Sequence, residues 1–175
     1  MANGGIRMTE DLPGVLVLCT GNSARSILGE AMLAKLGAGR LRAYSAGSKP
    51  KGVPHPGALR LLARRGIDTA PFRSKSWNEF TAAGAPRIDI AITVCDNAAQ
   101  EACPVFIGAP VKGHWGLPDP ADVEGGDEAV DAAFEATWQS LAVRVRALLA
   151  APFETMAPAA LQDLLSEIGR MDGAA

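Results

Sequence analysis

Short apolar runs alternate with amphipathic segments along most of the chain. Four runs have the length of strands and stop at glycine or polar positions, as strands of a buried sheet do. The predicted strands are residues 15–18, 41–46, 88–94 and 111–115. Other segments have apolar side chains at the three-to-four-residue spacing of a helix. The predicted helices are residues 26–36, 56–65, 76–82, 127–151 and 158–168. This alternation predicts an α/β fold with a parallel sheet.

The length favours one folded domain, because 175 residues lie within the usual range for a single unit. Residues 1–13 are polar and aperiodic, and we expect them to form a flexible N-terminal arm. The domain is expected to span residues 14–151. A C-terminal extension, residues 152–175, contains the last short amphipathic helix. The sequence leaves open whether that helix packs on the domain or on a partner subunit.

Composition and charge exclude several classes of protein. Hydrophobic residues make up 48% and charged residues 21% of the chain, which is ordinary for a globular protein and unlike a disordered one. The net charge of −2 provides no basic field for nucleic acid. No apolar run approaches the roughly 18 residues of a membrane span, and the first residues lack the order of a signal peptide. We therefore expect a cytoplasmic protein with neither a nucleic-acid nor a membrane partner.

The three cysteines, Cys19, Cys95 and Cys103, are the first candidates for chemistry. Structural disulfides are rare in the cytosol, so nucleophilic or redox use is favoured. Neither histidine forms a close-ligand pattern with them, and no metal site is expected. Cys19 and Cys95 each end an apolar strand. Because the carboxyl ends of parallel strands share one edge of a sheet, both thiols are predicted at the same edge.

Cys19 also begins a loop that has the features of an anion site. Five residues separate it from Arg25, and the loop follows a strand and opens a helix. Successive backbone N–H groups in such a loop can surround a tetrahedral oxyanion, and Arg25 can grip two of its oxygens. The helix N-terminus and Arg25 would favour the thiolate of Cys19, which is the nucleophilic form. The alternative is a buried cysteine before an ordinary strand-to-helix turn.

The loop sequence CTGNSARS resembles the active-site loop of the low-molecular-weight protein tyrosine phosphatase superfamily. The resemblance implies a four-stranded parallel sheet flanked by helices on both faces, with the helix after residue 151 as an addition. It also implies that Asn22 shapes the loop and that Ser26 hydrogen-bonds the nucleophile. The Asp119-Pro120 pair matches the general acid of the family. The implied oxyanion-binding loop consists of Thr20, Gly21, Asn22, Ser23, Ala24, Arg25 and Ser26.

The superfamily contains phosphatases and arsenate reductases, and residues outside the loop favour the reductases. Phosphatases of this type usually have aromatic residues after the Asp-Pro pair, whereas Ala121, Asp122 and Val123 follow it here. The segments TVCD, ACPV, VKGHWG and YSAG resemble the reductase branch. That resemblance implies attack of Cys19 on arsenate and a disulfide relay through Cys95 and Cys103. An external thiol reductant, thioredoxin or glutathione/glutaredoxin, would complete the cycle, with no bound cofactor.

Two other functions stay open. The chain could be a low-molecular-weight phosphatase that hydrolyses phosphotyrosine or aryl phosphates through a Cys19 phosphoenzyme, or an oxyanion-binding module without catalysis. In either case Cys95 and Cys103 would be small buried hydrophobic residues.

The sequence also departs from the family pattern. Ala24 stands where some relatives have a further cysteine, and seven residues separate Cys95 from Cys103, one more than in some thioredoxin-coupled members. Lys75 falls where potassium-binding members have an acidic residue. The other members of that site would be Asn22, Glu30 and Ser45. The Lys75 ammonium could replace the cation and pair with Glu30, or it could be solvated.

The two histidines lie outside these motifs. His55 is interpreted as a turn residue. His114 is expected either to brace the loop that carries Asp119 or to pack in the core.

Overall fold

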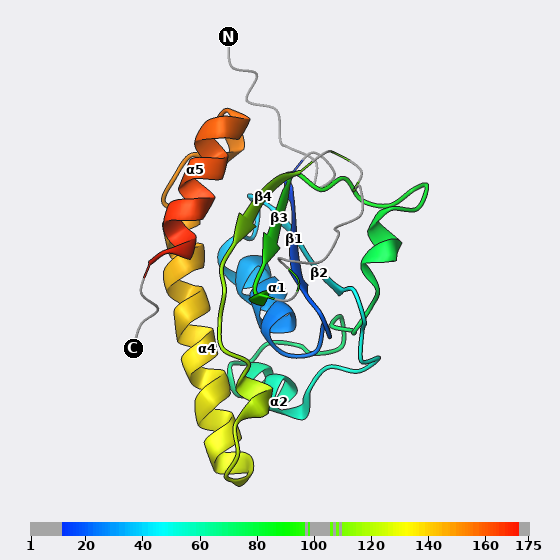
Figure 1. The fold of residues 1–175 in the computed structure, drawn as a ribbon, viewed down its shortest axis with the longest axis vertical. Helices are drawn as coiled ribbons and strands as arrows, with labels where there is room; N and C mark the ends of the chain where they lie inside the picture. Colours follow the sequence, from blue (N-terminus) through cyan, green and yellow to red (C-terminus); the bar gives the residue numbers. More distant parts are fainter. Residues whose placement is uncertain (1–11, 97, 99–105, 107, 109, 172–175) are drawn as a thin grey trace.

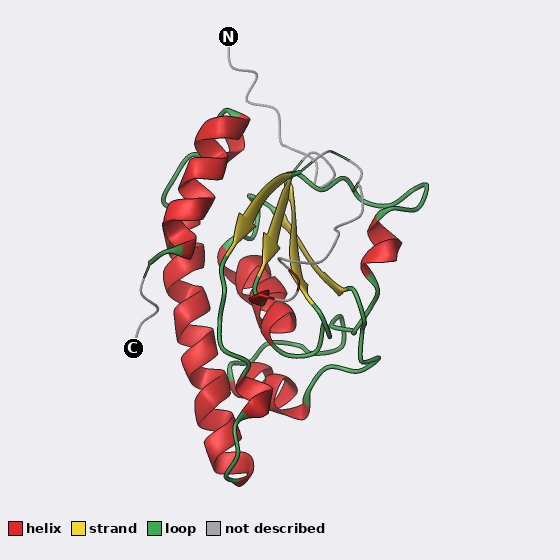
Figure 2. Ribbon diagram, in the orientation of Figure 1, coloured by secondary structure: helices red, strands yellow, loops and turns green. Residues whose placement is uncertain are grey.

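Four parallel strands form the centre of the molecule in the computed structural model, which describes residues 12–96, 98, 106, 108 and 110–171. The strands are β1 (Gly14–Cys19), β2 (Arg42–Gly47), β3 (Ile90–Thr93) and β4 (Val111–His114). Their order in the sheet is β2-β1-β3-β4 (Figure 2). Because every neighbouring pair is parallel, the carboxyl ends of all four strands lie at the same edge of the sheet. The prediction of a four-stranded parallel α/β domain is confirmed.

The helices lie where the apolar periodicity predicts them. The α-helices are α1 (Arg25–Leu36), α2 (Pro56–Arg64), α4 (Gly126–Leu149) and α5 (Pro158–Gly169). Short 3-10 helices follow at η2 (Trp77–Phe80), η3 (Pro120–Asp122) and η4 (Phe153–Thr155). Two of the expected elements were longer than the elements in the structure. The helix expected over residues 76–82 is the single turn of η2, and the strand expected over 88–94 pairs only from Ile90 to Thr93, opposite the equally short β4.

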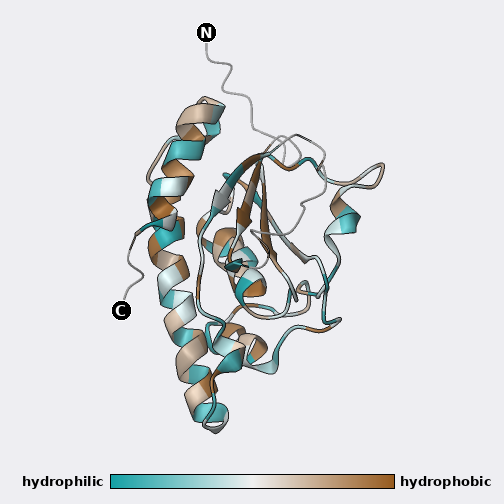
Figure 3. Ribbon diagram, viewed as in Figure 1, coloured by the Kyte–Doolittle hydropathy of each residue, from teal (hydrophilic) through white to brown (hydrophobic). Residues whose placement is uncertain are grey.

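The two faces of the sheet belong to different apolar clusters. Alternate residues of a strand point to opposite faces. Val15 and Val17 of β1 pack with α1, α2, α4 and α5 in the larger cluster. Leu16 and Leu18 pack on the other face with Phe80 of η2. The central strands are therefore apolar on both sides, which Figure 3 shows as brown ribbons.

The C-terminal helix packs on the domain itself, which answers the question that the sequence left open. Helix α5 lies over β4, and Figure 1 shows it running back along the upper part of α4 on one side of the sheet. Leu165 is fully buried, and its main-chain carbonyl accepts a hydrogen bond from the Trp115 indole. A Cβ at Gly113 would lie 2.8 Å from the Cβ of Leu165, so a glycine at this position lets helix and strand approach closely. Helix α5 therefore covers the edge strand β4.

None of the helices in the described part of the chain is long and apolar enough to span a lipid bilayer.

Candidate active site

The predicted oxyanion-binding loop, residues 20–26, connects the end of β1 to the start of α1. Asn22 has a φ of 44°, a left-handed conformation that asparagine tolerates better than most residues. Ala24 precedes α1 and provides no side-chain cap, and the first turn of the helix contains no acidic residue. The main-chain N–H groups at this helix start are thus left to a ligand, and the helix dipole favours an anion there.

A glycine on the neighbouring strand makes room for this loop. Gly47 ends β2 in register with Cys19. A Cβ at Gly47 would lie 2.4 Å from the carbonyl oxygen of Thr20 and 3.0 Å from the main-chain nitrogen of Asn22. Any side chain at this position would push the loop away from β2. Close packing against the loop therefore requires a glycine at the end of the YSAG segment.

Two hydrogen-bonding groups converge on the sulfur of Cys19, which is buried at 4% exposure. The main-chain N–H of Asn22 donates to Sγ at 3.2 Å, and Ser26 Oγ lies 2.9 Å from it. The Asn22 side-chain amide donates to Ser26 Oγ at 2.8 Å, which leaves the serine proton free to point at the sulfur. The main-chain N–H of Asn22 and the hydroxyl of Ser26 can therefore both donate to the Cys19 sulfur.

The Asn22 amide is itself held by a buried polar network. It donates to Ser45 Oγ at 3.0 Å, and its oxygen accepts the main-chain N–H of Lys75 at 2.9 Å. Ser45 donates in turn to Glu30 Oε1 at 2.6 Å. The Lys75 ammonium lies 3.7 Å from the same carboxylate oxygen and donates to the main-chain carbonyl of Arg73. The network therefore links the Glu30–Lys75 pair to the hydrogen bonds on Cys19.

Burial opposes the charges of this pair. Glu30 and Lys75 are each 9% exposed as whole residues. Burial raises the pKa of Glu30, although the Ser45 hydroxyl and the Lys75 charge act against the increase. Burial also lowers the pKa of Lys75, and the nearby Glu30 carboxylate counteracts that change. Each group thus supports the charge of the other, as expected for a buried ion pair, and the Ser45 hydroxyl adds to the support of Glu30.

Arg25 and Asp119 meet at the open side of the loop. The Arg25 guanidinium donates to the carbonyl of Leu117 at 2.8 Å and lies 3.5 Å from Asp119 Oδ2. The other carboxylate oxygen of Asp119 caps η3 by accepting the N–H of Ala121. The segment expected to hold the general acid therefore reaches the arginine of the loop.

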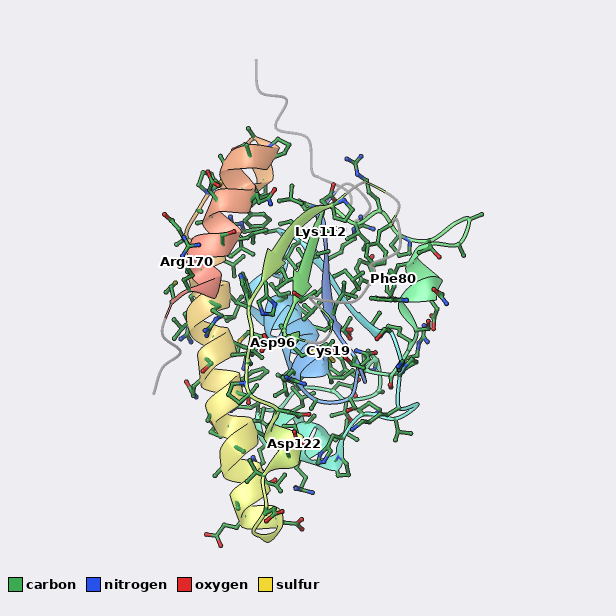
Figure 4. All side chains as sticks on the ribbon, viewed as in Figure 1. Cys19, Phe80, Asp96, Lys112, Asp122 and Arg170 are labelled. Carbon is green, nitrogen blue, oxygen red and sulfur yellow. The ribbon has the colours of Figure 1, made fainter. Side chains whose placement is uncertain are left out.

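Cys95 lies beside the loop, just beyond the end of β3. It is buried at 4% exposure, and its sulfur lies 3.7 Å from Thr20 Oγ1. The main-chain N–H of Ala98 donates to it at 3.4 Å. Figure 4 shows Cys19 and the neighbouring Asp96 at the same end of the sheet. The thiols of Cys19 and Cys95 are both free, and Cys103 lies outside the described residues.

The structure corrects the expectation for His114. Its Nδ1 lies 2.7 Å from Thr93 Oγ1 and its Nε2 lies 3.0 Å from Asp96 Oδ1. The ring is 41% exposed, so it does not pack in the core. It links the two residues that flank Val94 and Cys95.

His55 has a definite role in the fold. Its Nδ1 accepts the N–H of Gly57 as the N-cap of α2, and its ring stacks on Phe134. Burial lowers its pKa.

The loop, Arg25 and Asp119 enclose a cavity of about 190 Å³. Its lining residues are Cys19, Thr20, Gly21, Ser23, Ala24, Arg25, Lys49, Lys51 and Asp119. No aromatic side chain is among these described residues, and the described residues contain no cluster of His, Cys, Asp or Glu suited to a metal ion. Sequence reasoning missed Lys49 and Lys51. Their place just after the end of β2, at the edge where ligands bind, was the available signal.

Comparison with known proteins agrees with this fold and site. The chain belongs to the low molecular weight phosphotyrosine protein phosphatase family, whose model matches residues 14–160. It is 33% identical over 132 residues to an arsenate reductase of Halalkalibacterium halodurans, covering 75% of this chain and 91% of that protein.

Solved structures from both branches of the family resemble it. An arsenate reductase in the reduced state is 25% identical with a TM-score of 0.58, covering 79% of this chain and 98% of the other. The tyrosine phosphatase Wzb from Escherichia coli, in complex with sulphate, is 26% identical with a TM-score of 0.59. That likeness covers 78% of this chain and 99% of Wzb.

Proposed function

We propose that this protein is an arsenate reductase that uses Cys19 as nucleophile and Cys95 as resolving thiol. One observation carries the proposal: the sulfur of Cys95 lies 3.7 Å from the hydroxyl oxygen of Thr20, the residue after Cys19, and both thiols are free and buried. A phosphatase needs only the first of them. The similarity to arsenate reductases that cover most of the domain supports the same conclusion.

The first step forms a bond between sulfur and arsenic. The N–H groups of the loop and Arg25 hold three oxygens of arsenate above Cys19. The Cys19 thiolate attacks arsenic opposite the fourth oxygen, which points toward Asp119. That oxygen is the hydroxyl group of monohydrogen arsenate. It leaves as water after Asp119 adds one further proton, and the S–As bond forms as the As–O bond breaks.

The second step reduces arsenic. Cys95, after loss of its proton to solvent, attacks the sulfur of Cys19. The new S–S bond forms while the S–As bond breaks, and the electron pair of that bond stays with arsenic. Arsenic(V) thus becomes arsenic(III) and leaves as arsenite, while the two thiols are oxidised to a disulfide.

The third cysteine and an external thiol complete the cycle. Cys103 attacks Cys95, transfers the disulfide to the Cys95–Cys103 pair and releases Cys19 as a thiolate. Thioredoxin or glutathione with glutaredoxin then reduces that pair. Such a cycle requires the reducing environment of the cytoplasm.

Lys75 takes the place of a bound cation in this scheme. Its ammonium lies beside Glu30 and its main-chain N–H donates to Asn22. A positive charge on the side chain would support the Glu30–Ser45–Asn22 network without potassium. The network in turn keeps Asn22 and Ser26 in position to stabilise the Cys19 thiolate.

A second candidate activity is hydrolysis of aryl phosphates. The proximity of Arg25 and Asp119 favours it, because the same nucleophile, anion loop and acid suffice for a phosphoenzyme. The lack of aromatic residues among those that line the cavity gives a phosphotyrosine ring little to pack against, so we rank this activity second.

The deciding experiment measures arsenite formation and aryl-phosphate hydrolysis side by side. Arsenate is supplied with either the thioredoxin or the glutathione/glutaredoxin system. We expect arsenite with at least one of them, and loss of both activities in Cys19→Ser, whose hydroxyl does not ionise at neutral pH. Aryl-phosphate hydrolysis without arsenite from either system would favour the phosphatase. Normal turnover by Cys19→Ser would remove Cys19 from both mechanisms.

A further inference from the structure

Two exposed lysines line the mouth of the active-site cavity without a part in the steps above. Lys49 and Lys51 belong to the connection between β2 and α2, and both line the cavity that also contains Cys19. Their charges therefore act on whatever group of a substrate faces outward from the nucleophile.

Main-chain hydrogen bonds fix the position of this connection on the oxyanion-binding loop. The N–H of Lys49 donates to the carbonyl of Thr20, and the N–H of Lys51 donates to the carbonyl of Gly21, both at 2.9 Å. Farther along, the N–H of His55 donates to the carbonyl of Ser23 at 2.8 Å. The two lysines thus start from backbone positions that are tied to the loop itself.

The side chain of Lys51 is further held by packing. A Cβ at Gly21 would lie 3.2 Å from Cε and 3.3 Å from Cγ of Lys51, so the methylene stem lies across this glycine. The Ser74 hydroxyl donates to the Gly21 carbonyl and accepts the N–H of Gly52, which joins the same three segments. A long basic side chain whose apolar methylene stem packs in this way keeps its ammonium at the rim of the cavity.

The outward-facing atom differs between the two classes of substrate. In-line attack by Cys19 directs the leaving oxygen toward the mouth. In free arsenate or phosphate this oxygen bears charge or a hydroxyl group, which ammonium groups stabilise. In an aryl ester the same oxygen carries a ring, which binds best between apolar or aromatic side chains. With Arg25, the lysines give the mouth three cations against the single carboxylate of Asp119.

We propose that Lys49 and Lys51 are the specificity-determining residues of this pocket and select small free tetrahedral oxyanions over aryl-substituted ones. The inference rests on the proposed function for its reaction, but its binding part concerns the pocket alone. It explains selectivity by charge at the mouth rather than by the residues that surround the three inner oxygens.

The test compares the Lys49→Met/Lys51→Met double variant with wild type. Methionine keeps the stem that packs on Gly21 and removes the charge. The matched control is Lys112→Met, an exposed lysine of β4 that Figure 4 shows away from Cys19. Calorimetry measures the affinity for inorganic phosphate and for phenylphosphonate, which has a ring in place of the outward oxygen and is not hydrolysed. Steady-state assays give kcat/KM for arsenate.

We expect the double variant to lose about tenfold or more in phosphate affinity and in kcat/KM for arsenate, as for removal of a focusing charge. Its affinity for phenylphosphonate should stay the same or rise, and Lys112→Met should match wild type throughout. Equal losses for both ligands, or unchanged phosphate affinity, would overturn the proposal. If wild type binds phosphate more tightly than phenylphosphonate but produces no arsenite, the proposed function is refuted and the proposed selectivity of the pocket still holds.

Discussion

Thr20 Oγ1 lies 3.7 Å from the sulfur of Cys95, so the residue after Cys19 contacts the second thiol directly. Strand pairing produces this contact. Leu18 of β1 is in register with Thr93 of β3. Cys19 follows Leu18 by one residue and Cys95 follows Thr93 by two, so both cysteines emerge at the same edge of the sheet. A parallel arrangement is essential here, because an antiparallel neighbour would carry its C-terminal thiol to the opposite edge.

The first prediction concerns Asp119, the proposed general acid. Asp119→Asn should slow the first chemical step by about 10²–10⁴-fold, since an amide cannot deliver the proton that the leaving oxygen needs. Asparagine can still cap η3 as the aspartate does through its Oδ1. The rate is measured in single turnover with arsenate.

Phosphate affinity provides the control for Asp119→Asn. Calorimetry should find it little changed, because Arg25 and the loop hold the anion. An unaltered single-turnover rate would remove Asp119 from the mechanism.

The second prediction concerns the buried Glu30–Lys75 pair. Glu30→Gln leaves the Lys75 ammonium without its carboxylate in a buried site, and we expect a loss of about 3 kcal/mol in the free energy of unfolding. The Glu30→Gln/Lys75→Met double variant should recover most of that loss, because no unpaired charge remains. Urea unfolding of both variants and of Lys75→Met completes the cycle. Additive losses would show that the two side chains do not stabilise each other.

The sequence predicts those features of the molecule that depend on residues close together in the chain, and misses those that depend on residues far apart. The strands and helices follow from local apolar periodicity, and the loop between β1 and α1 follows from its residue types and its position after a strand. Both depend on residues near one another in the chain. The contacts of His114 do not, since they require the register that sets His114 opposite Thr93.

Lys49 and Lys51 illustrate the same limit. Main-chain hydrogen bonds to Thr20 and Gly21 bring them to the cavity, and such bonds impose no choice of residue type. The length of β3 was also overestimated, because its apolar run continues beyond the stretch that its partner β4 can pair with.

The third prediction concerns potassium. If Lys75 supplies the positive charge beside Glu30, wild type should have the same melting temperature and activity in sodium and potassium chloride at equal ionic strength. Lys75→Met leaves the oxygens of Glu30 and Ser45 without that charge, and we expect this variant to be stabilised by added potassium. A clear gain for wild type in potassium alone would contradict the role given to Lys75.

The last prediction separates the reductase from the phosphatase. Cys95→Ser should abolish multiple-turnover arsenate reduction and spare hydrolysis of an aryl phosphate, because only reduction needs a resolving thiol. Cys19 would still form its arsenic adduct, which then has no intramolecular route to a disulfide. Serine keeps a hydrogen-bonding atom near Thr20 and Ala98, so the fold should be preserved.

Cys103→Ser supplies the matched comparison for Cys95→Ser. It should release one arsenite per enzyme and then stall, if the reductant recognises only the Cys95–Cys103 disulfide. That disulfide requires a Cα separation of roughly 4.4–6.8 Å. Mass spectrometry of wild type after one equivalent of arsenate should therefore find Cys95 and Cys103 joined. If all three thiols stay reduced, or if both serine variants reduce arsenate at the wild-type rate, the thiol relay is wrong and the phosphatase takes its place.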